Sequence, residues 1–135
     1  MSRSRLESAL AQQIKAAGLP PPIREFRFAQ GLRDFRADFA WPEHHLLVEI
    51  SGGLWAGRAG GHTGPEGRYR DMRKLNLATL LGWGLLEFSG HDIDDGTALL
   101  EIEVALGRKG CLEWERYERA MRPIRAARNG RRRRR

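Results

Sequence analysis

Hydrophobic side chains near the start of the chain recur at the spacing of an α-helix. Leu6, Leu10, Ile14 and Ala17 fall on one side of such a helix, and Gly18, followed by three consecutive prolines, ends the pattern. The pattern predicts a first helix of about 14 residues with one apolar face. A proline-rich loop then separates this helix from the next elements.

In the segments that follow, the hydrophobic pattern has the two-residue period of a strand in some places and the period of a helix in others. Alternating residues with many aromatic side chains predict strands at 25–28 and 33–41, and a third strand is expected at 46–51. Beyond a glycine-rich stretch, the pattern predicts a helix at 66–81, an apolar strand at 84–88 and a helix at 95–106 capped by Asp94 or Asp95. The order αβββαβα predicts an α/β fold in which helices flank a mixed sheet.

The second and third strands are separated by a turn that contains Pro42. If the turn is centred between residues 43 and 44, Asp38 lies opposite Glu49, and Arg36 lies opposite Ser51. A slip of one residue would place the two carboxylates on opposite faces of the sheet. In the centred register, one face holds Ala37, Phe39, Trp41, Leu46, Val48 and Ile50, and the other holds Arg36, Asp38, Ala40, Leu47, Glu49 and Ser51.

Two carboxylates that face each other across strands repel, so a positive group between them is expected. Mg²⁺ suits this position because it prefers oxygen ligands and keeps several waters. Asp38 and Glu49 are therefore candidate metal ligands for the hydrolysis of a phosphodiester. In the alternative interpretation, Asp38 pairs with Arg36 or Arg33, and Glu49 points to solvent.

The charge of the 135-residue chain is unevenly distributed. The formal net charge is +7, yet residues 119–135 hold nine arginines and no acidic residue, so the rest of the chain is slightly acidic. The run 131–135 cannot bury apolar surface and is expected to be disordered alone. It is interpreted as an arm that binds phosphates, or alternatively as a solubilising terminus. We expect a domain at 1–107 and a C-terminal extension at 108–135 that ends in this basic tail.

Composition excludes several other classes of protein. Hydrophobic residues make up 41% of the chain, which is enough for a folded core. A single cysteine, Cys111, excludes an internal disulfide framework and a four-cysteine zinc site. The longest apolar stretch, 75–88, is too short and too polar to span a bilayer, and the start of the chain has no apolar signal-peptide core. A cytoplasmic protein without a membrane partner is expected.

The two strands RADFAWP (36–42) and LLVEISGG (46–53) resemble the core of the PD-(D/E)xK nuclease superfamily. Together with RYRDMRKLNLA (68–78) and LGWGLLEF (81–88), they are similar to small phage and bacterial endonuclease-like proteins related to very-short-patch-repair endonucleases. The resemblance extends over about residues 6–106. It implies a restriction-endonuclease-like αβββαβ core, with Mg²⁺, or Mn²⁺ as a substitute, held by Asp38, Glu49 and the Ile50 carbonyl.

The resemblance also implies roles for residues outside the hairpin. The superfamily places a lysine two residues after the glutamate, where this chain has Ser51, so a migrated lysine is expected and Lys74 is the candidate. Otherwise Lys74 is a surface residue paired with Asp71. His62 could assist as a base or orient the phosphate, and Glu7 could add a carboxylate from the first helix. In the alternative, His62 is a mobile polar residue of the glycine-rich loop, and Glu7 is solvated.

Basic and aromatic side chains near the proposed metal are expected to contact nucleic acid. Arginines would hold phosphates, and a tryptophan could stack on a base or, alternatively, cap the core. The residues concerned are Trp55, Arg58, Arg68, Arg70 and Arg73, together with Arg131 and Arg132 of the tail.

The sequence therefore favours a Mg²⁺-dependent DNA endonuclease with Asp38, Glu49, Lys74 and His62 as catalytic residues. A structure-selective enzyme, such as a junction resolvase, is a specific form of this hypothesis, and a homodimer would then be expected to cut two strands. Two alternatives remain at this point. One is a DNA- or RNA-binding protein that has lost catalysis with the lysine, and the other is a basic structural protein of a nucleoprotein particle.

Overall fold

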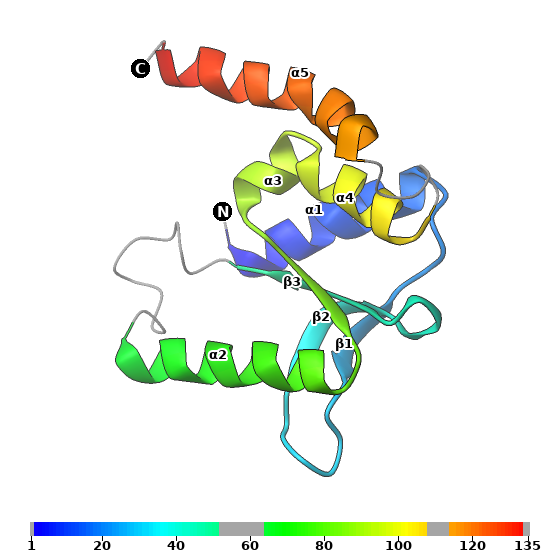
Figure 1. Ribbon diagram of the computed structural model, residues 1–135, viewed down its shortest axis with the longest axis vertical. Helices are drawn as coiled ribbons and strands as arrows, with labels where there is room; N and C mark the ends of the chain where they lie inside the picture. Colours follow the sequence, from blue (N-terminus) through cyan, green and yellow to red (C-terminus); the bar gives the residue numbers. More distant parts are fainter. Residues whose placement is uncertain (1, 52–63, 108–113, 134–135) are drawn as a thin grey trace.

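The computed structural model describes residues 2–51, 64–107 and 114–133 (Figure 1). The elements in chain order are α1 (Arg3–Ala16), β1 (Ile23–Arg27), β2 (Arg36–Trp41), the 3-10 turn η1 (Pro42–His44), β3 (Leu46–Ile50), α2 (Pro65–Leu80), β4 (Gly84–Phe88), α3 (Gly90–Asp94), α4 (Thr97–Ala105) and α5 (Trp114–Arg133). The predicted order of elements is confirmed up to β4. The chain is an α/β protein with an open, mixed sheet of four strands flanked by helices.

The strands lie in the sheet in their chain order, β1-β2-β3-β4. The first two pairings are antiparallel, and β3 pairs with β4 in parallel, with α2 as the crossover between them. In the β2–β3 hairpin, Phe39 pairs with Val48 and Trp41 pairs with Leu46. These pairs follow the register predicted from a turn centred between residues 43 and 44, so that prediction is confirmed.

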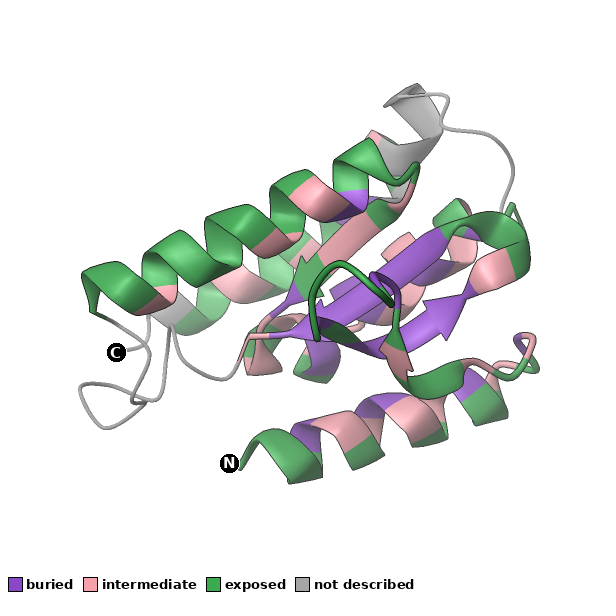
Figure 2. Cartoon of the chain, turned by 90° about the horizontal axis from the view of Figure 1, so that it is seen from below, coloured by how far each residue is buried: buried purple, intermediate pink, exposed green. Residues whose placement is uncertain are grey.

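Helices cover both faces of the sheet. In Figure 2 the buried sheet lies between α1 and α2. On the α1 side, Leu10 and Ile14 are buried with Phe39 and Val48, and residues of α3 and α4 complete this core. On the other side, Ala78 of α2 is buried in a smaller cluster with aromatic residues near β1 and β2. The apolar stripe predicted for the first helix is thus the surface that α1 buries.

The predicted common face of Ala37 and Phe39 is wrong. Ala37 packs in the cluster on the α2 side, whereas Phe39 packs in the core on the α1 side. Between the ladder pairs Arg24–Phe39 and Phe26–Ala37, the backbone of Glu25 has a φ of 51°. The regular alternation of side chains is therefore interrupted beside Asp38.

The single helix predicted at 95–106 is two helices in the structure. α3 begins after Ser89, whose amide donates a hydrogen bond of 2.8 Å to the Asp92 carboxylate. Gly96, with a φ of 86°, ends this segment and precedes α4, so the residue before α4 is neither Asp94 nor Asp95. Asp95 still accepts a hydrogen bond of 3.0 Å from the Thr97 amide.

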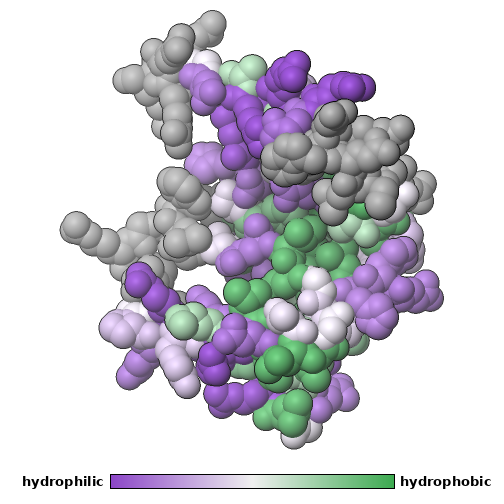
Figure 3. Space-filling view, viewed as in Figure 1, coloured by the Kyte–Doolittle hydropathy of each residue, from purple (hydrophilic) through white to green (hydrophobic). Residues whose placement is uncertain are grey.

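The C-terminal extension includes a helix that packs on the domain. α5 continues to Arg133, where a disordered arginine run is expected from the sequence. Met121 of α5 is buried, and Arg128 forms ion pairs with Asp92 and Asp95 of the α3 region. Arginine has a good helix propensity, which agrees with a helix that continues into the arginine run. In Figure 3, α5 presents a hydrophilic surface, and hydrophobic side chains gather over the region of β4.

None of the described helices has both the length and the apolar character needed to cross a membrane.

Candidate active site

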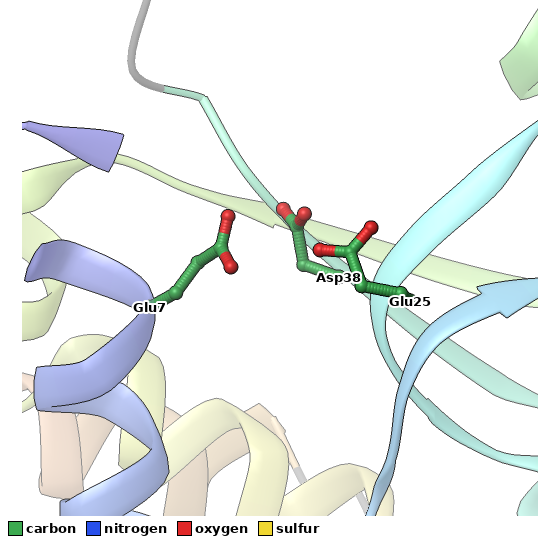
Figure 4. Close-up of side chains that lie close together, drawn as sticks. All are labelled: Glu7, Glu25 and Asp38. Atoms are coloured by element: carbon green, nitrogen blue, oxygen red, sulfur yellow. The ribbon is translucent and has the colours of Figure 1, made fainter. Parts of the chain in front are cut away.

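Three carboxylates from three elements lie close together beside β1 and β2. Glu7 extends from α1, Glu25 from β1 and Asp38 from β2, and their side chains point toward one another (Figure 4). One oxygen from each lies within 4.8 Å of the others. Because carboxylate oxygens are the ligands that hard divalent cations prefer, this triad could hold a metal ion.

Asp38 is the buried centre of the group, with only 2% of the residue exposed. Its Oδ2 accepts a hydrogen bond of 2.7 Å from the Ile50 amide, and its Oδ1 accepts one of 2.7 Å from Arg3. These bonds fix the carboxylate against β3. The alternative pairing of Asp38 with Arg33 or Arg36 is not found among the described ion pairs.

Glu49 lies on β3, where the hairpin register places it opposite Asp38. The residue is 9% exposed, so the alternative in which it points to solvent is wrong. Its Oε2 lies 3.3 Å from Arg3 Nη2, and its Oε1 forms an ion pair with Lys74 Nζ. Asp38 and Glu49 are therefore linked through a shared cation.

Lys74 reaches this group from α2. Its Nζ contacts Glu49 Oε1 and donates a hydrogen bond to the Arg36 carbonyl, so its partner is Glu49 rather than Asp71. Burial lowers the pKa of the Lys74 ammonium to about 8, since the charged form loses contact with water. The nearby Arg3 lowers this pKa further, and Asp38 is the main group that opposes the shift.

Two members of the site have no signal in the sequence pattern. Glu25 has the left-handed backbone noted above, which costs on the order of 1–3 kcal/mol for a residue of this kind. Its neighbours in the ladder place it opposite Asp38, so only the register of the β1–β2 pair in the folded structure brings it to the site. Arg3 was missed because its two distant partners, Asp38 and Glu49, are brought to it only by the fold.

Glu7 forms ion pairs with two cations, Arg3 at 3.2 Å and Arg24 at 3.3 Å. Partial burial raises the pKa of its carboxyl, and the negative charge of Asp38 raises it further. The solvated role considered for Glu7 is therefore wrong, and its side chain belongs to the acidic group.

The remaining predicted residues differ in how far the structure describes them. Ile50 contributes an amide hydrogen bond to Asp38, and the Ser51 amide donates to the Phe88 carbonyl at 2.8 Å, so both backbone groups tie β3 into the site region. Trp55, Arg58 and His62 lie outside the described residues.

The predicted arginines of α2 are exposed. Arg70 lies over the Phe35 ring at 5.2 Å, Arg73 lies over the Tyr69 ring at 5.6 Å, and Arg68 lines a shallow hollow beside Tyr69. Arg131 is exposed on α5, and Arg132 belongs to the same helix. In Figures 1 and 2, the starts of α1 and α2 and the end of α5 lie toward the same side of the molecule.

Comparison of the chain with family models, curated proteins and solved structures found no match.

Proposed function

We propose that the protein is a metal-dependent endonuclease of the PD-(D/E)xK type that hydrolyses phosphodiester bonds in DNA. The observation that carries this proposal is the contact of buried Glu49 with Lys74 of α2, next to Asp38, where Arg3 of α1 also reaches both carboxylates. A lysine with a pKa of about 8 beside two carboxylates is a combination suited to hydrolysis near neutral pH.

The donor set fits a hard divalent cation. Asp38 and Glu49 would hold Mg²⁺ or Mn²⁺ through carboxylate oxygens, and Glu7 and Glu25 lie close enough to Asp38 to add further ligands. Such an ion supplies positive charge to the phosphate oxygens and lowers the pKa of water. The group offers only oxygen ligands, so it does not fit the softer metals that prefer cysteine sulfur.

Lys74 supplies the group that the superfamily pattern would place at Ser51. Its contact with Glu49 fixes the amine beside the proposed ligands. Because the pKa is about 8, roughly a tenth of the side chain is neutral at pH 7 and can accept a proton from the attacking water. The remaining protonated fraction can donate a hydrogen bond to a phosphate oxygen.

The exposed arginines favour a polyanionic substrate. Arg68, Arg70 and Arg73 lie on α2, which also carries Lys74, and α5 adds further exposed cations. Contacts with phosphate position a nucleic acid without reading its sequence. A substrate selected by its structure, such as a branched DNA, agrees with such contacts.

One observation favours a second candidate function, a DNA- or RNA-binding protein without catalysis. Arg3 and Lys74 already contact the carboxylates of Asp38 and Glu49. A protein that had lost its metal could keep this arrangement as a structural ion-pair network. Both functions predict binding of nucleic acid, so they differ only in cleavage and in metal binding.

Metal removal separates the two functions. Purified protein is incubated with plasmid, single-stranded, flap and four-way-junction DNA in Mg²⁺, in Mn²⁺ and in EDTA. We expect cleavage in either metal and none in EDTA, because the carboxylates alone cannot stabilise charge on the phosphate. Glu49→Gln is expected to lose cleavage, whereas Glu43→Gln, an exposed change at the far end of the same hairpin, is not. Binding of every DNA without cleavage would favour the second function.

The arginines of α5 are expected to strengthen binding without affecting chemistry. Arg119, Arg122 and Arg131 are exposed, whereas Arg125 pairs with Glu118 and Arg128 pairs with Asp92. Replacing the first three with glutamine should reduce the slope of log K against log salt concentration by roughly 2 to 3 on duplex DNA, since about one counterion is released per phosphate contact. Fluorescence anisotropy over a salt series measures this slope.

A matched control for this series is the triple replacement of Arg5, Arg27 and Arg33 with glutamine, which removes the same charge from other exposed positions. An equal loss of slope in the control would show that net charge, and not the placement of α5, determines binding.

A further inference from the structure

Arg3 makes the most extensive set of contacts in the acidic group. Its Nη2 lies 2.7 Å from Asp38 Oδ1 and 3.3 Å from Glu49 Oε2, and its Nε lies 3.2 Å from Glu7 Oε1. One guanidinium therefore contacts three carboxylates that come from α1, β2 and β3. These are the oxygens that would hold a divalent cation under the proposed function.

The group carries more negative than positive charge, so a cation of higher charge would be bound more favourably than the arginine. The four carboxylates of Glu7, Glu25, Asp38 and Glu49 face three cations, namely Arg3, Arg24 and Lys74. Glu25 forms no ion pair with any residue that the structure describes. With Arg3 in place the group keeps one net negative charge, and exchange of Arg3 for a divalent ion would make it neutral.

Arg3 is also the most exposed of the three cations in this group. It lies in the first turn of α1, and 55% of its side chain is exposed, compared with 42% for Arg24 and 19% for Lys74. An ion pair with so exposed a partner is weakened by solvent, and the free guanidinium regains water and rotamer freedom. Lys74, in contrast, is held by Glu49 and by the Arg36 carbonyl.

We propose that Arg3 is an internal counter-ion that occupies the carboxylate group in the absence of metal and must be displaced before a divalent cation binds. This inference rests on the proposed function, because it assumes that the same carboxylates hold the metal. Displacement lowers the apparent affinity for the cation in proportion to the fraction of molecules in which the site is free. Arg3 therefore sets the metal concentration at which the site fills.

Calorimetric titration of the full chain with Mn²⁺ tests this role without measuring cleavage. Arg3→Gln removes the charge and keeps a polar side chain, and it is expected to lower the dissociation constant for Mn²⁺ on the order of tenfold. Arg5→Gln is the matched control, since Arg5 is exposed on the same helix and forms no ion pair with the described residues. Its dissociation constant should equal that of the wild type.

Thermal unfolding gives a reciprocal measurement. Without metal, Arg3→Gln should unfold at a lower temperature than the wild type because the carboxylates lose a counter-ion. Saturating Mn²⁺ should bring the two melting temperatures together. If Arg3→Gln fails to fold, Arg3→Lys replaces it; this variant keeps one charge without the guanidinium fork and should bind Mn²⁺ with an affinity between those of the wild type and the glutamine variant.

The outcomes distinguish this inference from the proposed function. Equal or weaker Mn²⁺ binding by Arg3→Gln or Arg3→Lys, with wild-type binding intact, would overturn the role of Arg3 and leave the nuclease proposal standing. Absence of Mn²⁺ binding in wild type and variants alike would overturn both.

Discussion

Replacement of Asp38 with asparagine is expected to lower the rate of DNA cleavage by at least about 10³-fold, as removal of a central catalytic group does in hydrolases. Asp38 is the buried centre of the carboxylate group. Its replacement removes one of the two negative charges, those of Asp38 and Glu49, that Arg3 contacts together. The asparagine oxygen can still accept the Ile50 amide hydrogen bond, so the fold should persist. Cleavage of the preferred DNA in Mg²⁺, under single-turnover conditions, measures the effect.

Two further measurements separate loss of chemistry from loss of structure. Mn²⁺ should raise the melting temperature of the wild type, since a ligand that binds only the folded state stabilises it, and this rise should vanish in Asp38→Asn. Asp34→Asn is the matched control, because Asp34 is exposed and pairs only with Arg27 among the described residues. Retained cleavage in Asp38→Asn would contradict the PD-(D/E)xK assignment of this site, since Asp38 would then not be an essential metal ligand.

Much of the fold could be predicted because its signals are local. The helix α1 follows from an apolar stripe ended by Gly18, and the β2–β3 register follows from a short turn with alternating strands on either side. The helical state of residues 131–133 could not be predicted in this way. The helix α5, which includes these residues, is held to the domain by contacts distant in the chain: Met121 is buried, and Arg128 pairs with Asp92, which lies 36 positions earlier.

The residues of the candidate site also fall into those that local signals predict and those that depend on long-range contacts. Alternation was sufficient to bring Asp38 and Glu49 to facing positions, because both belong to one hairpin. Arg3 and Glu25 could not be found from spacing. Arg3 is 35 positions from Asp38 in the chain. Glu25 has a left-handed backbone conformation, which glutamate rarely adopts and which its sequence therefore does not predict. Contacts of this kind are set by how α1 and β1 pack and not by any periodic pattern.

Replacement of Lys74 with methionine is expected to slow cleavage by about 10²- to 10⁴-fold, the range for loss of a positioned proton acceptor. Methionine keeps much of the side-chain length and removes the amine that contacts Glu49. The sign of the pH dependence follows from the lowered pKa. The neutral amine, which accepts the proton, increases as pH rises toward about 8, so the wild-type rate should rise up to that pH and then level off.

The shape of this profile tests Lys74 beyond its effect on rate. In Lys74→Met the rise that ends near pH 8 should disappear, while any pH dependence due to water at the metal should persist in both proteins. Lys15→Met is the matched control, because Lys15 is exposed on α1 and its loss should change neither the rate nor the profile. If Lys74→Met lowers the rate but keeps the rise, the amine orients the phosphate and a different group accepts the proton. If the variant cleaves at the wild-type rate, the contact between Lys74 and Glu49 is structural, and the superfamily lysine has no counterpart in α2.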